Sequence, residues 1–478
     1  MRNLTISLII ALSFSMIAQA SSKNEKVSSK VSLFPAPKGM KASPDFAVKV
    51  NGKEAFVYTT KVRTCTHRPE RAMGMSYFDC SDSATVTVTA NVSMENAVIR
   101  PKSLGIKSVV KGKSISFTMH KNQKITIEPN GYEYDAIAIF ANALELNPPK
   151  ENDPNVIYYG PGIHNVGVVK LSSNKTVYFA GGSVVRGRFE ANGVTGLKFM
   201  GHGMIDHGQD SVESRFLRLN KCSNVTVDGP IFFDGWGGAL TSLTSTNVRI
   251  SDLKIVGKSA DGISMDACKN HLVESCFVRN HDDAVVVKSK YGVGDVRNIL
   301  VRNCVIWSDR AQALEVGFEL QTALVDSIIF KNIDIIHAYG NNAISIHNGS
   351  QAVARDIRFE DIRIEDLDAT YCRPVSTPST YIFLLEIGKS KWSKTGGQGN
   401  IHNIYFKNLS VTTKAGSDFP VSSMVGFDAE HTVENITFEN FTIDGKLIKT
   451  VEEGKIGVNS IELVKNVNFI ATKNVAIQ

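Results

Sequence analysis

The feature that most constrains the fold is a short pattern that returns many times in the second part of the chain. Each copy places an asparagine or aspartate before alternating aliphatic and polar residues, and a second apolar stretch follows closely. Copies recur about every 20 to 30 residues, which is typical of a solenoid of stacked coils made from short strands. The clearest copies are Asn224-Val-Thr-Val, Asn247-Val-Arg-Ile, Asn298-Ile-Leu-Val, Asp356-Ile-Arg-Phe, Asn403-Ile-Tyr-Phe and Asn435-Ile-Thr-Phe.

This pattern predicts an all-β protein of two domains. Two or three strands per coil, with polar residues at the corners, predict a right-handed parallel β-helix over residues 149–478. Residues 21–148 instead show short alternating runs, such as residues 84–90, and an Asn51-Gly52 turn. Such runs are typical of antiparallel strands, so we expect an N-terminal β-sandwich. A Pro-rich polar segment, residues 147–154, marks the boundary.

Residues 1–20 predict a signal peptide. Arg2 supplies the positive start, residues 8–18 are mainly apolar, and Ala18-Gln19-Ala20 suits cleavage. The apolar stretch is too short to span a bilayer. We therefore expect a secreted or periplasmic protein with no membrane attachment after cleavage, and an uncleaved anchor is the alternative.

Charge and cysteine content narrow the possible partners. The formal net charge is +6, and the basic residues are scattered rather than clustered, so we expect no nucleic-acid partner. A mildly basic chain permits an acidic substrate without requiring one. The seven cysteines include no Cys-x-x-Cys pair, so a structural zinc site is not expected. Cys65 and Cys80 are candidates for a disulfide in an oxidising compartment. We expect a monomer.

Three aspartates lie at corresponding places in two successive copies of the pattern. Asp261 precedes the run 262–265, and Asp282 and Asp283 precede the run 284–287. Neighbouring coils lie about 4.8 Å apart, so stacking brings the three carboxylates together. Strict alternation directs Asp282 and Asp283 to opposite faces, so both reach one groove only if one lies in a turn or bulge. Carboxylates crowded in this way are costly unless they carry out chemistry or bind a cation, and a calcium site is the competing interpretation. Asp-Gly turns and solvated corners are the structural alternative.

The strands that follow these aspartates predict two columns of side chains. The inner column holds Ile263, Met265, Val285, Val287, Leu314, Val316, Ile344 and Ile346. The outer column holds Ser264, Val286, Glu315 and Ser345, followed by Asp266, Lys288, Gly317 and His347. Candidate substrate contacts near this column are His281, Lys288, Gln312, Glu315, Tyr339, Asn342 and His347, with Trp236 as a sugar-stacking platform. A structural role is an equal alternative for each of them.

The aspartate pattern resembles that of glycoside hydrolase family 28, the polygalacturonase type, and its relative family 49, the dextranase and isopullulanase type. Family 28 carries Asn-Thr-Asp and then Asp-Asp, and residues 259–261 and 282–283 stand in those places. The resemblance covers the chain from about residue 156 onward. It implies a right-handed parallel β-helix and hydrolysis with inversion of the anomeric centre. It also implies that Asp282 is the general acid and that Asp261 and Asp283 hold and deprotonate water, with no metal or other cofactor.

Two departures from the pectinase pattern bear on the substrate. Residues 311–313, Ala-Gln-Ala, replace Gly-His-Gly, and residues 345–347, Ser-Ile-His, replace the Arg-x-Lys that holds a uronate. Loss of that cationic pair disfavours polygalacturonate. A neutral glucan, or another galactan-like or sulfated polymer, fits better, and the N-terminal sandwich and Lys288 resemble the dextranase side.

The sequence therefore predicts an exported, inverting glycoside hydrolase with a polysaccharide substrate. The alternatives are a polygalacturonase-type pectinase, a calcium-dependent polysaccharide lyase and a non-catalytic glycan-binding β-helix.

Overall fold

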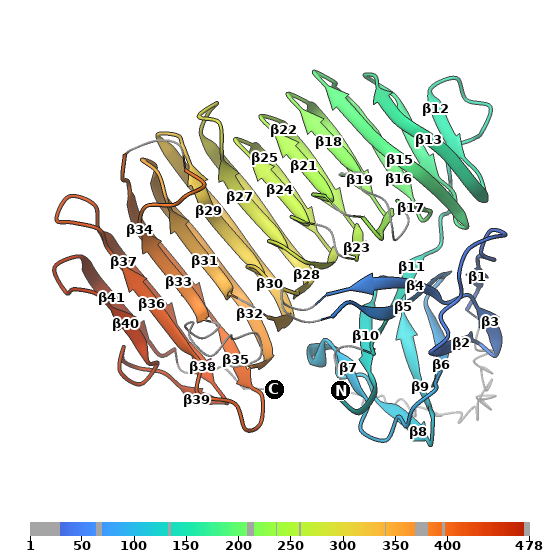
Figure 1. Cartoon of the computed structure of the whole chain (residues 1–478), viewed down its shortest axis with the longest axis horizontal. Helices are drawn as coiled ribbons and strands as arrows, with labels where there is room; N and C mark the ends of the chain where they lie inside the picture. Colours follow the sequence, from blue (N-terminus) through green and yellow to red (C-terminus); the bar gives the residue numbers. More distant parts are fainter. Residues whose placement is uncertain are drawn as a thin grey trace, which may run out of the picture.

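The computed structural model describes residues 29–63, 69–131, 135–207, 215–235, 237–257, 260–339, 341–368, 381–393 and 397–472. These residues form an N-terminal β-sandwich followed by a long right-handed parallel β-helix (Figure 1), so the predicted fold class is confirmed. No helix in this part of the chain is long and apolar enough to cross a membrane. The predicted signal peptide, and Cys65 of the candidate disulfide, lie outside the described residues.

The sandwich is built from two sheets that enclose one apolar core. One sheet has the order β1-β5-β11-β10-β7 with β4 beside β5, and the other has the order β3-β2-β6-β9-β8. Alternating residues of each strand point into the core: in β6, residues 84, 86, 88 and 90 are buried and their neighbours are more exposed. The elements are β1 (Val31–Leu33), β2 (Phe46–Val50), β3 (Lys53–Ala55), β4 (Tyr58–Val62), β5 (Arg71–Cys80), β6 (Ser83–Ala90), β7 (Val98–Arg100), η1 (Lys102–Leu104), β8 (Ser108–Lys111), β9 (Ser114–His120), β10 (Lys124–Glu128), η2 (Pro129–Gly131) and β11 (Ile137–Ala143).

The β-helix begins after the segment 144–155, and its coils contribute strands to three faces. Face 1 contains β12 (Val156–Tyr159), β14 (Thr176–Phe179), β16 (Lys198–Gly201), β19 (Ser223–Asp228), β22 (Thr246–Ser251), β25 (Lys269–Glu274), the first parts of β28 (Val296–Ser308), β30 (Leu324–Ala338) and β32 (Val353–Leu367), then β34 (Asn400–Lys407), β37 (Val433–Glu439) and β41 (Val464–Ile470).

Face 2 contains the first parts of β13 (Gly162–Leu171) and β15 (Ser183–Asn192), then β17 (Met204–Asp206), β20 (Ile231–Phe233), β23 (Lys254–Val256), β26 (Phe277–Asn280), the second parts of β28, β30 and β32, β35 (Ser410–Thr413) and β38 (Thr442–Ile443), which pairs with β39 (Lys446–Leu447). Face 3 contains the second parts of β13 and β15, then β18 (Leu217–Asn220), β21 (Leu240–Leu243), β24 (Ile263–Asp266), β27 (Val285–Ser289), β29 (Leu314–Leu320), β31 (Asn342–Asn348), β33 (Tyr381–Ile387), β36 (Val421–Val425) and β40 (Ile456–Val458).

The repeated asparagines form a ladder along one corner of the β-helix. Asn224, Asn247, Asn270 and Asn298 all have φ near +55°, a left-handed conformation that asparagine tolerates better than most residues. The side-chain amides of the last three donate to the amide oxygen of the asparagine one coil earlier, at 3.1, 3.1 and 2.9 Å. The recurring Asn therefore stabilises the corner in two ways, by its left-handed backbone conformation and by its side-chain hydrogen bond.

The predicted inner column of face 3 is confirmed, and so is the first part of the outer column; in its second part Asp266 pairs with Lys288, but a bulge interrupts the register between Lys288 and Gly317. All eight inner residues belong to one core cluster inside the coils. In the outer column the register pairs Ser264 with Val286, Val286 with Glu315, and Glu315 with Ser345. Because successive strands are parallel and in register, residues far apart in sequence lie side by side on this face.

The sandwich packs against face 2, with β4, β5 and β11 along the underside of the β-helix in Figure 1. Apolar side chains fill this interface from both sides. From the sandwich come Tyr58, Met73, Met75, Tyr77 and Phe140, and from face 2 come Val184, Met204, Ile231, Phe233, Val256 and Phe277.

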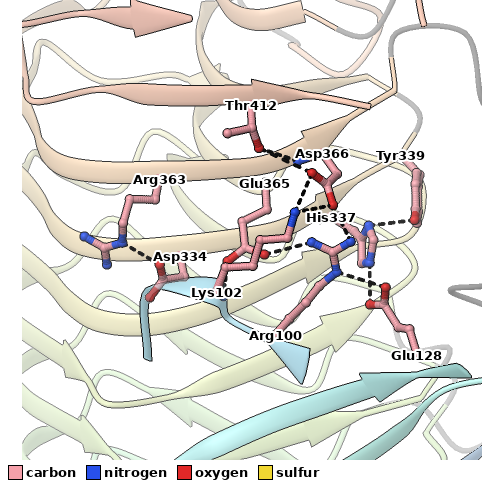
Figure 2. A network of polar contacts seen from close by, with 10 residues as sticks. All are labelled: Arg100, Lys102, Glu128, Asp334, His337, Tyr339, Arg363, Glu365, Asp366 and Thr412. Carbon is pink, nitrogen blue, oxygen red and sulfur yellow. Dashed lines mark hydrogen bonds and ion pairs between the residues drawn. The ribbon is translucent and has the colours of Figure 1, made fainter. Parts of the chain in front are cut away.

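A buried ionic network also joins the two domains (Figure 2). Arg100 of the sandwich donates to Glu128 at 2.9 Å and crosses to Glu365 at 2.8 Å and Asp366 at 2.6 Å in the β-helix. His337 bonds to Glu128 at 2.6 Å. Since the guanidinium and Glu128 are almost fully buried, this network fixes the orientation of the domains and would be costly to break.

Candidate active site

The three aspartates meet on one ridge, at the corner where face 2 turns into face 3. Asp261 lies in the turn between β23 and β24, and Asp282 and Asp283 lie one coil later between β26 and β27. One carboxylate oxygen of each lies within 4.8 Å of the others. Both members of the Asp282-Asp283 pair reach the ridge because they occupy a turn before the strand, where alternation does not apply.

Asn280 holds the two turns together. Its side chain is fully buried, and its amide donates to the carbonyl oxygens of Ala260 at 2.6 Å, Asp282 at 3.0 Å and Asp283 at 3.0 Å. One side chain thus connects the backbones that carry all three carboxylates. The sequence analysis did not single out Asn280, because its role depends on which turns become neighbours.

Each carboxylate on the ridge has a different set of partners. Lys288 Nζ donates to Asp261 Oδ2 at 2.8 Å. The Asp283 backbone N–H donates to Asp282 Oδ1 at 3.1 Å, and the Gln312 backbone N–H donates to Asp283 Oδ1 at 3.3 Å. Burial disfavours the Lys288 cation, but the Asp261 and Asp283 carboxylates outweigh it and raise the pKa of Lys288.

Crowding and burial shift the protonation of the aspartates. Burial, followed by the charge of Asp261, raises the pKa of Asp282 above its usual range. The same two causes raise the pKa of Asp283 to about 8, against the opposing effect of Lys288. The ridge therefore retains a proton near neutral pH, which a cluster of ordinary surface aspartates would not do.

A cleft of about 190 Å³ opens directly beside Asp261 on face 3. Its lining residues are Arg215, Arg218, Gly238, Thr241, Leu243, Ala260, Asp261, Ser264, Asp266, Lys288, Lys290 and Tyr291. Two larger hollows, of about 600 and 560 Å³, lie in the sandwich and between the domains, away from the ridge. We take the smaller cleft as the substrate site because Asp261 lines it beside the other two aspartates, and because it also holds Asp266, whose pKa burial raises to about 6.

Several of the predicted contact residues lie around the ridge. Lys288 lines the cleft, and Gln312 contacts Asp283 through its backbone. His281 precedes the aspartate pair, and its Nδ1 donates to the carbonyl of Arg63 at 2.9 Å, so the residue that follows β4 supports this turn. Asn342 is buried at the start of β31, where its carbonyl accepts from the Ala313 N–H at 3.2 Å.

Glu315 and His347 extend the outer column beyond the ridge. Burial, together with the charge of Asp283, raises the pKa of Glu315 well above its usual range. Burial lowers the pKa of His347 to about 4, so this imidazole is neutral at physiological pH. Neither of its ring nitrogens has a hydrogen-bond partner among the described residues.

Tyr339 does not belong to the cleft, which corrects the prediction of a substrate contact. It is 3% exposed, and its hydroxyl lies 2.6 Å from His337 Nδ1 in the interdomain network of Figure 2. The packing of the sandwich against face 2 covers it. Trp236, the predicted stacking platform, lies outside the described residues.

The ridge is also a candidate metal site. Three carboxylates within 4.8 Å suit a hard cation such as calcium. The Lys288 ammonium, however, already supplies a positive charge 2.8 Å from Asp261, where a cation would have to compete with it. A second cluster, of Asp79, Glu145 and His202, lies between the domains, where His202 Nδ1 donates to Asp79 at 2.8 Å and Tyr178 donates to Glu145 at 2.8 Å.

Fold and site together define a class: a parallel β-helix with an acidic ridge beside a cleft on one face. No protein-family model matches the chain, and no curated protein matches its sequence.

Among solved structures, Dex49A from Penicillium minioluteum, a dextranase of glycoside hydrolase family 49, matches with a TM-score of 0.65 and 16% identity. The match covers 92% of this chain and 96% of that one, so it extends over both domains. The exopolygalacturonase from Thermotoga maritima matches with a TM-score of 0.49 and 18% identity, over 66% of this chain and 83% of that one. The match to Dex49A confirms the resemblance at the level of fold.

Proposed function

We propose that the chain is an exported glycoside hydrolase that cleaves a non-pectic polysaccharide with inversion of the anomeric centre. The observation that carries this proposal is the ridge on which Asp261, Asp282 and Asp283 meet beside a cleft. Glycoside hydrolysis needs a protonated carboxyl that donates to the leaving oxygen and an ionised carboxylate that accepts a proton from water. The ridge supplies both, because Asp282 and Asp283 have raised pKa values and Asp261 is ion-paired with Lys288.

Exposure separates the roles of the three groups. Asp283 is only 7% exposed, whereas Asp282 is half-buried and more open to solvent. Asp282 therefore donates its proton to the glycosidic oxygen as the bond to the anomeric carbon breaks. A water molecule held by Asp261 and Asp283 forms the new bond to that carbon, and Asp261 accepts the proton that the water loses. No metal or other cofactor takes part in this scheme.

The sugar that binds beside Ser345 and His347 is neutral in this proposal. Pectinases place a cationic pair at these positions, whereas here Ser345 is fully buried and His347, whose pKa burial lowers to about 4, is an uncharged imidazole. The uronate groups of polygalacturonate find no cationic pair at this position, so polygalacturonate is a poor substrate. The enzyme acts as a monomer outside the cytoplasm, after removal of residues 1–20.

The test is the release of reducing ends from a panel of dextran, other α-glucans, agar- and carrageenan-type galactans and polygalacturonate. The wild-type protein is expected to cleave at least one non-pectic polymer. Asp282→Asn is expected to lower that rate by a factor of about 10² to 10⁴ while its circular dichroism stays unchanged. Asp356→Asn, at an exposed corner of face 1, is the matched control and should retain full activity. Wild-type turnover by Asp282→Asn would refute the assignment of the acid, and robust cleavage of polygalacturonate would refute the neutral subsite.

A calcium-dependent polysaccharide lyase is the second candidate. One observation favours it: the same three carboxylates lie close enough together to bind a hard cation. A lyase would give an unsaturated product that absorbs in the ultraviolet, and a chelator would abolish its activity. Hydrolysis that a chelator leaves unchanged would exclude it.

A further inference from the structure

The cleft has a cationic wall on the side toward the N-terminal coils. Arg215 and Arg218 line the cleft next to Asp261, and they also line a second hollow of about 180 Å³ together with Arg188 and Glu190. The two hollows share these arginines, so they form one track that crosses successive coils of face 3.

The register of face 3 gives the position of this wall along the track. Arg218 on β18 pairs with Thr241 on β21, and Thr241 pairs with Ser264 on β24. Arg218 therefore lies two strand spacings, roughly 10 Å, from the strand that follows Asp261. A polymer that lies across the strands and presents one bond to the aspartates would place a neighbouring unit against this wall.

The charges of Arg215 and Arg218 are not neutralised within the part of the chain that the structure describes. Neither forms an ion pair there, and Arg218 Nε is buried without a hydrogen-bond partner. Other charged groups of the track have partners, and Asp266 accepts a hydrogen bond from the Lys290 backbone N–H at 2.8 Å. Lys288 pairs with Asp261, Lys290 pairs with Glu319 at 3.6 Å, and Glu190 accepts from Arg188 at 3.1 Å.

The opposite end of the track is different in character. There the outer column continues through Glu315, which has a raised pKa, to Ser345 and the neutral His347. Glu315 and Ser345 are fully buried there and the ring nitrogens of His347 are covered, so the positive charge of the cleft lies on its arginine side. A uniformly neutral polymer would offer the guanidinium groups only hydroxyl acceptors and no counter-charge when it displaced water from the cleft.

We infer that Arg215 and Arg218 form a subsite for an anionic substituent of the polymer, a sulfate ester or a carboxylate. The substituent belongs to a sugar unit one or two positions from the scissile bond, on the N-terminal side of the ridge. Guanidinium groups suit this task because their planar fork donates two parallel hydrogen bonds to such oxygens. This inference rests on the proposed function and narrows its substrate to an anionic glycan whose unit at the Ser345 side is uncharged.

The experiment measures binding with the Asp282→Asn protein, in which turnover is disabled. Three fluorescent oligosaccharides of equal length serve as probes: a sulfated galactan, an oligogalacturonate and an uncharged isomaltooligosaccharide. One anionic probe is expected to bind at least about tenfold more tightly than the uncharged one at low salt, and which of the two it is distinguishes sulfate from carboxylate. Adding Arg218→Gln should weaken that probe roughly tenfold and leave the uncharged probe unchanged.

Two further variants in the same background sharpen the result. Arg218→Lys keeps the charge but loses the fork, so an intermediate affinity is expected. Arg249→Gln removes an exposed arginine that pairs with Glu274 on face 1, and it should leave both affinities unchanged. Equal binding of charged and uncharged probes, or equal effects of Arg218→Gln and Arg249→Gln, would overturn the inference.

The outcome also separates this inference from the proposed function. If Arg218-dependent binding is found but the wild-type protein hydrolyses none of the polymers, the subsite stands and the hydrolase proposal fails. If the wild-type protein hydrolyses a neutral glucan at a rate that Arg218→Gln does not change, the hydrolase proposal stands and the subsite fails.

Discussion

Replacing Asp283 by asparagine should make the protein more stable and inactive at the same time. The pKa of this carboxyl is about 8 in the folded protein, against an ordinary value of 3.8. Between those two values the folded state binds a proton that the unfolded state has released. Stability therefore falls as the pH rises through this window, by about 1.4 kcal/mol per pH unit, and the accumulated cost at pH 7 is on the order of 4 kcal/mol.

The asparagine side chain in Asp283→Asn is uncharged at every pH, so the variant does not lose stability by ionising a buried group at this position. Its amide oxygen can still accept the hydrogen bond from the Gln312 N–H, which keeps the turn intact. The melting temperature of the variant should exceed that of the wild type by several degrees at pH 8, and the difference should shrink toward zero near pH 4. Loss of hydrolysis should accompany the gain, as expected where an active site is maintained at a cost in stability.

The assay is differential scanning calorimetry of both proteins at one scan rate, from pH 4 to pH 8.5. Asp356→Asn is the control, because this aspartate is exposed at a corner and its replacement should give no difference that grows with pH. A variant no more stable than the wild type at any pH, or a difference that grows toward acid, would refute the explanation of the raised pKa.

Two further substitutions test the supports of the site. Asn280→Ala removes the amide that joins the two aspartate turns. Initial rates on the substrate found in the panel should show kcat lowered about 10²-fold and KM nearly unchanged. An unchanged kcat would show that the turns keep their positions without this amide. Arg100→Met leaves the buried carboxylates of Glu128 and Glu365 without their cation, so urea unfolding should show a free energy of unfolding lower by about 3–5 kcal/mol. The exposed control Arg358→Met should lower the free energy of unfolding by under about 1 kcal/mol. Similar losses in the two arginine variants would contradict the role of the interdomain network.

Much of the fold is predictable because the repeated pattern has a simple physical basis. Alternation assigns Ile263, Val285 and Leu314 to the inside of the coils, and coil stacking brings Asp261 beside the Asp282-Asp283 pair. These relations depend only on strand geometry and a constant spacing between coils. The same geometry explains the recurring asparagines, whose side chains bond from coil to coil.

The remaining site features depend on contacts between segments that the sequence pattern does not relate. Tyr339 is removed from the cleft because the sandwich covers it, and His347 is neutral because neighbouring side chains bury it. Arg215 and Arg218 become part of the cleft only once the register places β18 two strands from β24. Asn280 acts across a turn whose partner lies one coil earlier.

The most direct test of the proposed mechanism is to follow the anomeric configuration of the first product by proton NMR during hydrolysis. We predict that the new reducing end first appears with the configuration opposite to that of the cleaved linkage, before mutarotation mixes the anomers. The test discriminates because one oxygen of each carboxylate lies within 4.8 Å of the others. That spacing is nearer to the roughly 5–5.5 Å between the carboxyl groups of retaining enzymes than to the roughly 6.5–9.5 Å of inverting ones, so inversion here requires that the water enter between Asp261 and Asp283. A first product of retained configuration would contradict direct attack by water and would identify one of the aspartates as a nucleophile.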